Sequence, residues 1–198
     1  MSTQPATRRR GRALTEAIHL ATLEELARTS FAELSFDKIA AAAGTGKAAL
    51  YRRWPNPETL VLAALTDPAT GFGDPLTPPG TGSLRADLMT LLTRFTDILG
   101  QPRGRALRPL IAYRHQHPAL FAEVWAAVIQ PAQETLLAVL AAAAARGEAD
   151  PARVTPRAAA VGPRMLLLEA WATGEADAGE VAAVVDEILL PLLTRPAR

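Results

Sequence analysis

The chain has 198 residues and no cysteine, which is long enough to bury a core without staples and excludes disulfides, thiolate nucleophiles and cysteine-based metal centres. Its 21 basic and 20 acidic side chains give a formal charge of +1, which argues against a surface that coats polyanions throughout. Hydrophobic residues make up 49%, aromatic residues only 5%, and no alternating β-branched runs occur, so the composition predicts an all-α fold.

The charge is divided unevenly along the chain. Residues 1–60 carry nine basic and six acidic side chains, whereas residues 61–198 carry twelve and fourteen. Four of the basic residues form a cluster near the N-terminus: Arg8, Arg9, Arg10 and Arg12. No apolar stretch directly follows this cluster, so it is not expected to be a secretory signal. The most apolar run, 136–145, falls short of the ~20 residues that span a bilayer, and we expect a cytoplasmic protein without a membrane partner.

Three helices are expected first along the chain. Apolar residues at helical spacing predict a helix over about 9–29. Ser35 is a suitable N-cap for a second helix, which Gly44 ends by supplying a left-handed residue. After a tight turn, a third short helix is predicted over 47–54, where Pro55 stops it.

The second and third predicted helices form a helix-turn-helix motif. Lys47, Tyr51 and Arg52 are expected on its outer face, and the second helix of such a motif fits the major groove of DNA. The small side chains of Ala48 and Ala49 would allow close approach to the bases and contact with a thymine methyl group. The motif therefore predicts a DNA-binding head.

The turn itself, GTGK over 44–47, also resembles part of a phosphate-binding loop. That loop needs glycine and Ser or Thr where this chain has Ala41 and Ala48, and it follows a strand rather than a helix. A nucleotide site is therefore not expected here.

The segment Phe31 to Val61, FAELSFDKIAAAAGTGKAALYRRWPNPETLV, resembles the DNA-binding domain of the TetR family of transcriptional regulators. The matching residues, in register and without gaps, are Ile39, Ala40, Ala43, Gly44, Leu50, Tyr51, Trp54, Glu58 and Leu60. The resemblance implies a three-helix head over 1–60 and a helical effector-binding and dimerisation domain over 61–198, about nine helices in all. It also implies a repressor that a small, largely apolar effector releases from a palindromic operator.

The chain departs from the family pattern at Ser30, Gly46 and Pro57. Gly46 removes a hydroxyl that would cap the recognition helix, and Pro57 replaces a phosphate-binding lysine but suits a helix start after Asn56. Neighbouring arginines can compensate for the lost phosphate contacts. The residues predicted to contact DNA are Arg8, Arg9, Arg10, Arg12, Ser35, Lys38, Thr45, Lys47, Ala48, Ala49, Tyr51, Arg52 and Arg53.

The second half of the chain is expected to hold a long loop and then five helices. Proline and glycine fill the loop over 67–83. The helices are predicted over 84–99, about 103–115, 119–145, about 156–173 and about 178–194. Pro131 must kink or divide the third of these helices, because proline cannot donate the interior hydrogen bond.

The last two predicted helices are apolar on more than one face, which favours burial against a second subunit. The resemblance implies that they form a four-helix bundle with their mates in a homodimer. The interface is predicted to include Leu166, Leu167, Ala170, Trp171, Val181, Val184, Val185, Ile188, Leu189 and Leu192. Completion of a monomer core is the alternative.

An effector pocket is predicted where polar groups interrupt the apolar helices, because such groups orient a mostly hydrophobic ligand. By resemblance, it is expected to be lined by Leu88, Leu92, Phe95, Tyr113, Phe121, Trp125, Ile129, Met165 and Glu169.

Signals for catalysis and metal binding are weak. His115 and His117 are two residues apart, so on a helix they point to opposite sides and cannot chelate one metal. No nucleophile elbow is present. We therefore expect no enzyme, no cofactor and no metal. An α-helical enzyme or ligand carrier without sequence-specific DNA binding stays open as an alternative, as does a regulator controlled by a protein partner.

Overall fold

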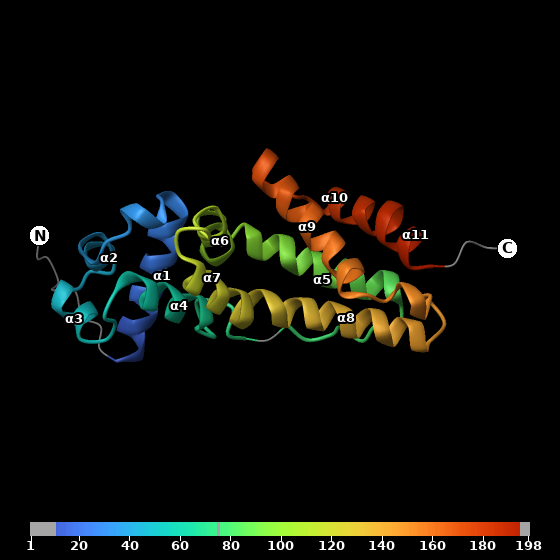
Figure 1. The fold of residues 1–198 in the computed structure, drawn as a ribbon, viewed down its shortest axis with the longest axis horizontal. Coiled ribbons are helices and arrows are strands. Elements are labelled where there is room, and N and C mark those ends of the chain that lie inside the picture. The colour runs from blue at the N-terminus through green and yellow to red at the C-terminus, as the bar shows by residue number, and fades with distance from the viewer. Residues whose placement is uncertain (1–10, 75, 195–198) are drawn as a thin grey trace, which may run out of the picture.

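The computed structural model describes residues 11–74 and 76–194, and every regular element within those ranges is helical. The all-α prediction is therefore confirmed. The molecule is elongated, with helices α1 to α4 at one end and the bundle of α5 and α8 to α11 at the other (Figure 1). Helices α6 and α7 lie between these two ends.

The N-terminal end holds five short elements. They are α1 (Arg12–Arg28), the 3-10 turn η1 (Phe31–Glu33), α2 (Phe36–Ala42), α3 (Lys47–Tyr51) and α4 (Pro57–Thr66). The Oγ atom of Ser35 accepts from the amide of Lys38, and Asn56 Oδ1 accepts from the amide of Thr59 at 2.9 Å, so both predicted N-caps are confirmed. Gly44 follows α2 with φ of 65°, the left-handed region that only glycine enters freely.

Helix α3 is shorter than the predicted 47–54. Beyond its last residue the chain tightens, and the amides of Arg53 and Trp54 both donate to the carbonyl of Leu50 at 2.9 Å. This turn carries Trp54 inward, where only 9% of its surface is exposed. The buried indole therefore holds the end of the recognition helix against the head.

The C-terminal end is a helical bundle. Its elements are α5 (Leu84–Leu99), α6 (Pro102–Ala112), α7 (Pro118–Val124), η2 (Trp125–Ile129), α8 (Gln130–Ala145), η3 (Pro151–Arg153), α9 (Pro156–Thr173), α10 (Ala178–Ala183), η4 (Val184–Leu189) and α11 (Leu190–Leu193). Helix α5 packs against α8 and α9, and α9 packs against η4. The bundle is thus closed by the C-terminal helices folding back onto α5.

Pro131 was predicted to kink or divide its helix, but the structure shows a different local change. The helix continues from Pro118 to Ala145, because the π-helical turn η2 precedes the proline. In that turn the amide of Gln130 donates to the carbonyl of Trp125, five residues back instead of four. The wider turn accommodates Pro131, which has no amide hydrogen to donate to the preceding turn. A second π-helical turn, η4, stands just before Pro191 in the same way.

The continuous helix over 118–145 is longer and more apolar than the run 136–145 suggests. By length and composition alone its 28 residues could cross a membrane, and 28% of its most apolar window is buried in the protein. In this fold it supplies Leu136, Val139 and Leu140 to the core of the bundle.

Two apolar clusters form the core. The first joins α1 to α4 but is completed by side chains from α6, α7 and η2: Ala106, Leu107, Leu110, Leu120, Val124 and Val128. The second fills the bundle around α5, α8, α9 and the C-terminal helices. The predicted boundary after residue 60 falls inside α4 and inside the first cluster, so the division into 1–60 and 61–198 stays a prediction.

Candidate nucleic-acid interface

The outer face of α3 is open to solvent at the far end of the head. Lys47, Ala48 and Arg52 are exposed, and 55% of the surface of Tyr51 is accessible. Leu50 is fully buried and Ala49 is 9% exposed, so both face the core. Ala49 was predicted to contact DNA; its position next to Leu50 on the inner face corrects that assignment, because a buried methyl group cannot reach a base.

Lys47 is held by two neighbours. Its Nζ lies 2.7 Å from Asp37 Oδ2 on α2 and 5.6 Å from the centre of the Tyr51 ring. The Tyr51 ring in turn meets Phe36 edge-on, with 4.7 Å between the ring centres. The hydrogen bond to Asp37 raises the pKa of Lys47 above its ordinary value. The lysine is therefore charged, and it forms an ion pair with a carboxylate of its own chain.

The arginines of the head differ in their partners. Arg53 Nη1 donates to Thr15 Oγ1 at 2.6 Å, which fastens the turn after α3 to α1. Arg12 Nε donates to Glu16 at 2.7 Å on the surface of α1. The side chain of Arg52 is exposed and makes no hydrogen bond or ion pair with any described residue, although its amide donates to the carbonyl of Ala48. Arg52 is thus the guanidinium of this face that is free to bind an anion.

The other predicted DNA contacts occupy the edge of the motif. Ser35 caps α2, and the amide of Thr45 donates to the carbonyl of Ala40 within the turn. Lys38 Nζ lies 3.7 Å from Glu25 Oε1, a carboxylate that is 4% exposed and also bonds Arg28. Arg8, Arg9 and Arg10 lie outside the described residues.

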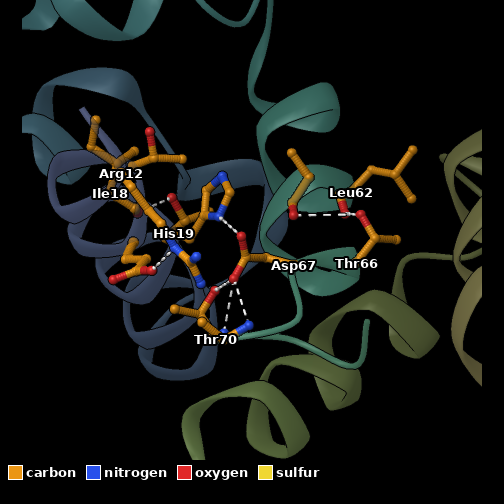
Figure 2. A network of polar contacts seen from close by, with 12 residues as sticks. Arg12, Ile18, His19, Leu62, Thr66, Asp67 and Thr70 are labelled. Carbon is orange, nitrogen blue, oxygen red and sulfur yellow. Dashed lines mark hydrogen bonds and ion pairs between the residues drawn. The ribbon is translucent and has the colours of Figure 1, made fainter. Parts of the chain in front are cut away.

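A buried polar contact joins the head to the start of the body. His19 of α1 faces Asp67, which follows α4, with 3.4 Å between Nδ1 and Oδ2, too long for a good hydrogen bond (Figure 2). Asp67 Oδ1 accepts the amides of Ala69 and Thr70 and the Thr70 hydroxyl. Burial opposes ionisation of Asp67, but these bonds outweigh it and lower its pKa. Sequence reasoning missed this pair, because its members are far apart in the chain.

The pH dependence of folding should report this contact. Burial is the main cause that lowers the pKa of His19 below its ordinary value of 6.5. As the pH falls below 6.5, the unfolded chain therefore binds a proton that the folded chain refuses, and the free energy of unfolding decreases. Urea unfolding of His19→Gln between about pH 7.5 and 5 should show a shallower decrease than the parent, the difference being at most about 1.4 kcal/mol per pH unit for one proton. Parallel curves for the two proteins would show that His19 is not the group responsible.

A second contact joins the head to α7. His117, the residue before α7, places Nδ1 2.6 Å from Oε1 of Glu58 at the start of α4. Its ring also packs on Phe31, with 4.6 Å between the ring centres. A histidine thus lies near each end of α4: His117 bonds Glu58 near its start, and His19 faces Asp67 beyond its end. Glu58 was noted only as part of a motif, and the sequence carries no local signal for its partner.

The residues predicted to line an effector pocket are spread along the bundle. Leu88 and Leu92 line a cavity of about 10 Å³ between α5, α8, α9 and η4, which holds no more than a water molecule. The rings of Phe121 and Trp125 lie 6.1 Å apart, and Trp125 is 37% exposed. The others lie elsewhere along the helices: Phe95 packs on the bundle core, Tyr113 on the first cluster, Ile129 and Glu169 are half-buried, and Met165 is exposed.

The face predicted to bind a second subunit divides into two sets. Five of its members pack inside the protomer's own core: Leu166, Val181, Val184, Val185 and Leu189. Their burial in the core of the bundle leaves no surface for a partner subunit to contact, which corrects the prediction for these positions. Ile188 and Leu192 are 40% and 39% exposed, and Leu167, Ala170 and Trp171 are half-buried.

Leu168 is the most exposed large apolar side chain of the described residues, at 67%, and sequence reasoning left it out of the interface. Met165, one turn before it on α9, is 38% exposed. The sequence shows by helical spacing that Met165 and Leu168 share one side of α9, but it does not show whether that side faces the core. Among the described residues, no three His, Asp or Glu side chains gather as a metal site requires.

Comparison with known proteins agrees with this geometry. The family model for bacterial regulatory proteins of the tetR family matches residues 18–64, and the model for the tetracyclin repressor-like C-terminal domain matches residues 78–188. The crystal structure of a TetR-family transcriptional regulator from Mesorhizobium loti has the same fold, with a TM-score of 0.72 at 20% identity over 94% of this chain and 100% of the other. At that identity the likeness shows the fold alone.

Two curated relatives extend the match over nearly the whole chain. The HTH-type transcriptional regulator Rv1556 of Mycobacterium tuberculosis is 30% identical over 175 residues, which cover 88% of this chain and 85% of the relative. The DNA-binding transcriptional repressor TetR of Mycobacteroides abscessus is 28% identical over 194 residues, covering 96% and 98%. With an exposed helix-turn-helix head, a helical body and matches to both domains of one family, the chain belongs to the TetR family of DNA-binding transcriptional regulators.

Proposed function

We propose that this regulator is a homodimeric repressor that releases a palindromic operator when a small, largely apolar effector binds its helical body. Regulators of this family bind operator DNA and small-molecule effectors and act as dimers. Membership of such a family agrees with the prediction that the chain is not an enzyme. Because its target is chromosomal DNA, the proposed place of action is the cytoplasm.

The observation that carries the proposal is the exposed face of α3. Arg52 is free, Ala48 leaves room for close approach, and Tyr51 and Lys47 stand beside them. Arginine donates a pair of hydrogen bonds to guanine or to a phosphate, and a small side chain next to it lets the helix enter the major groove. The proposed roles are a base or phosphate contact for Arg52 and phosphate contacts for Tyr51 and Lys47.

The proposed dimer forms through a revised face of α9 and the C-terminal helices. Four of the seven exposed large apolar side chains of the described residues lie there: Met165, Leu168, Ile188 and Leu192. Helix α9 packs against η4, which leads into α11, and exposed apolar side chains on adjoining elements mark an interaction site. A two-fold axis through this face would present one α3 from each subunit to successive major grooves.

Control by an effector is proposed to act through α4. Helices α6 and α7 complete the core around α1 to α4, so a ligand that separates helices of the bundle would also move the head. Because the cavity lined by Leu88 and Leu92 is only about 10 Å³, an effector would have to open this region, selecting a conformation that the tightly packed structure excludes. Two such heads would then no longer match the groove spacing.

Selection from a random-sequence DNA library tests the DNA-binding part of the proposal. The expected result is an enriched palindrome whose half-sites lie about 10–10.5 base pairs apart, centre to centre, or a multiple of that. Binding without any enriched sequence would rule out a specific operator. A thermal-shift screen with apolar compounds, followed by release of the selected operator, tests the effector; an operator that no compound releases would favour control by a protein partner.

A further inference from the structure

One acidic side chain stands on the DNA-facing side of the head and holds a residue proposed to bind DNA. The side chain of Asp37 is 68% exposed, and its Oδ2 lies 2.7 Å from Nζ of Lys47 across the gap between α2 and α3. The two residues are ten positions apart, so the turn at 44–46 and not a helical repeat brings them together. Lys47 itself is 44% exposed in its side chain, which leaves the ion pair open to solvent and to DNA.

Aromatic contacts reinforce this arrangement. Tyr51 lies under the ammonium group at 5.6 Å, where the face of the ring attracts a cation. Phe36, next to Asp37 in α2, packs edge-on against the same tyrosine. The ammonium group of Lys47 thus contacts the carboxylate of Asp37, on α2, and the ring of Tyr51, on α3. A DNA phosphate that approaches the same ammonium group competes with this carboxylate for its charge.

We infer that Asp37 is an internal counter-anion that competes with DNA phosphate for Lys47 and so limits the affinity of the head for DNA. The inference rests on the proposed DNA-binding role of α3. When Lys47 turns to a phosphate, Asp37 loses its partner and its charge faces the polyanion at close range. Each head therefore offers phosphate one fewer free positive charge than its number of basic side chains suggests. This restraint acts on any DNA sequence, because phosphate contacts carry no sequence information.

Removal of the carboxylate provides the test. Binding of the parent and of Asp37→Asn to a labelled mixed-sequence duplex is measured by fluorescence anisotropy over a range of salt concentrations. At low salt the variant is expected to bind about fivefold more tightly, and log K against log salt is expected to steepen by about 2 per dimer, one extra counterion released at each head. Asp37→Ser serves as a second variant, because it also removes the charge and keeps a polar residue in the first turn of α2.

Two comparisons separate a specific ion pair from a general effect of charge. Glu24→Gln removes the same charge from an exposed position of α1 that makes no ion pair with a described residue, and it should leave affinity and salt slope nearly unchanged. In a Lys47→Met background, Asp37→Asn should lose most of its effect. Circular dichroism checks that each variant keeps its helices.

The outcomes distinguish this inference from the function on which it rests. If the parent binds the duplex and Asp37→Asn binds no better, or if Glu24→Gln gains as much, the inference fails while DNA binding stands. A gain that persists in full without Lys47 would likewise overturn it. If the parent does not bind the duplex even at low salt, the proposed DNA-binding role fails and the inference fails with it.

Discussion

Arg52→Ala is expected to weaken binding to the selected operator about a hundredfold, through a loss of about tenfold at each of the two half-sites. The reason is the state of this guanidinium in the structure. Arg53 is hydrogen-bonded to Thr15 and Lys47 is paired with Asp37, whereas the guanidinium of Arg52 makes no bond with the described residues and exchanges only water for DNA. The affinity is measured by fluorescence anisotropy at matched salt for parent and variant.

The matched control for Arg52→Ala is Arg94→Ala. Arg94 is exposed on α5, which lies in the bundle and away from α3 (Figure 1), so its removal changes the charge equally but at a distance from the recognition helix. It should change operator affinity by less than a factor of about two, because screening weakens charges beyond a distance of about 10 Å. Both variants should remain dimers on sedimentation. Equal affinity of Arg52→Ala and the parent would mean that α3 is not the reading helix.

Leu168→Glu is expected to raise the dissociation constant of the dimer about a hundredfold or more, since a two-fold interface counts every substitution twice. Leu168 is 67% exposed, and Met165 on the same helix and Ile188 on the adjoining η4 are also exposed apolar side chains. A carboxylate there must be desolvated in each subunit when the faces meet. Operator binding should fall in parallel, because two heads on one dimer bind a palindrome far better than separate heads. Sedimentation velocity over a range of concentrations measures the change.

Two further variants serve as controls for Leu168→Glu. Leu20→Glu places the same charge on an exposed leucine of α1 and should leave the dimer intact. Leu166→Ala, at a neighbouring residue with no exposed surface, should instead lower the free energy of unfolding by about 2–5 kcal/mol, through the cavity that it leaves in the protomer. If Leu168→Glu sediments as a dimer like the parent, this face is not the interface.

Local chemistry made the head predictable from the sequence. The caps at Ser35 and Asn56 act through hydrogen bonds between residues three positions apart, and the left-handed turn at Gly44 needs only the glycine itself. Such features are complete within one turn of helix, so the residues that make them are adjacent in the chain. The helix over 118–145 was harder. Its proline was correctly expected to disturb the hydrogen bonds, but whether the chain breaks or widens into a π-helical turn depends on what the flanking turns pack against.

The candidate site was only partly predictable for the same reason. Helical spacing placed Lys47, Tyr51 and Arg52 on one face, but it could not show that Asp37 holds Lys47 or that Thr15 holds Arg53. On the last two helices the apolar pattern could not tell which side faces the core, so Leu166 was predicted at the interface and Leu168 was left out. Both helices are apolar over much of their circumference, and only packing against the rest of the bundle decides which apolar face is buried.

The sequence by itself determined that the chain is all-helical, that a helix-turn-helix begins after Ser35 and ends before Pro55, and that the protein resembles TetR regulators, because propensity, capping and turn chemistry act between near neighbours. The tertiary structure decided what depends on distant residues meeting: the closure of the head's core by α6 and α7, the pairs His19 with Asp67 and Glu58 with His117, and the surface left for a partner. Contacts over such separations follow from the packing of whole helices, and no local pattern encodes them.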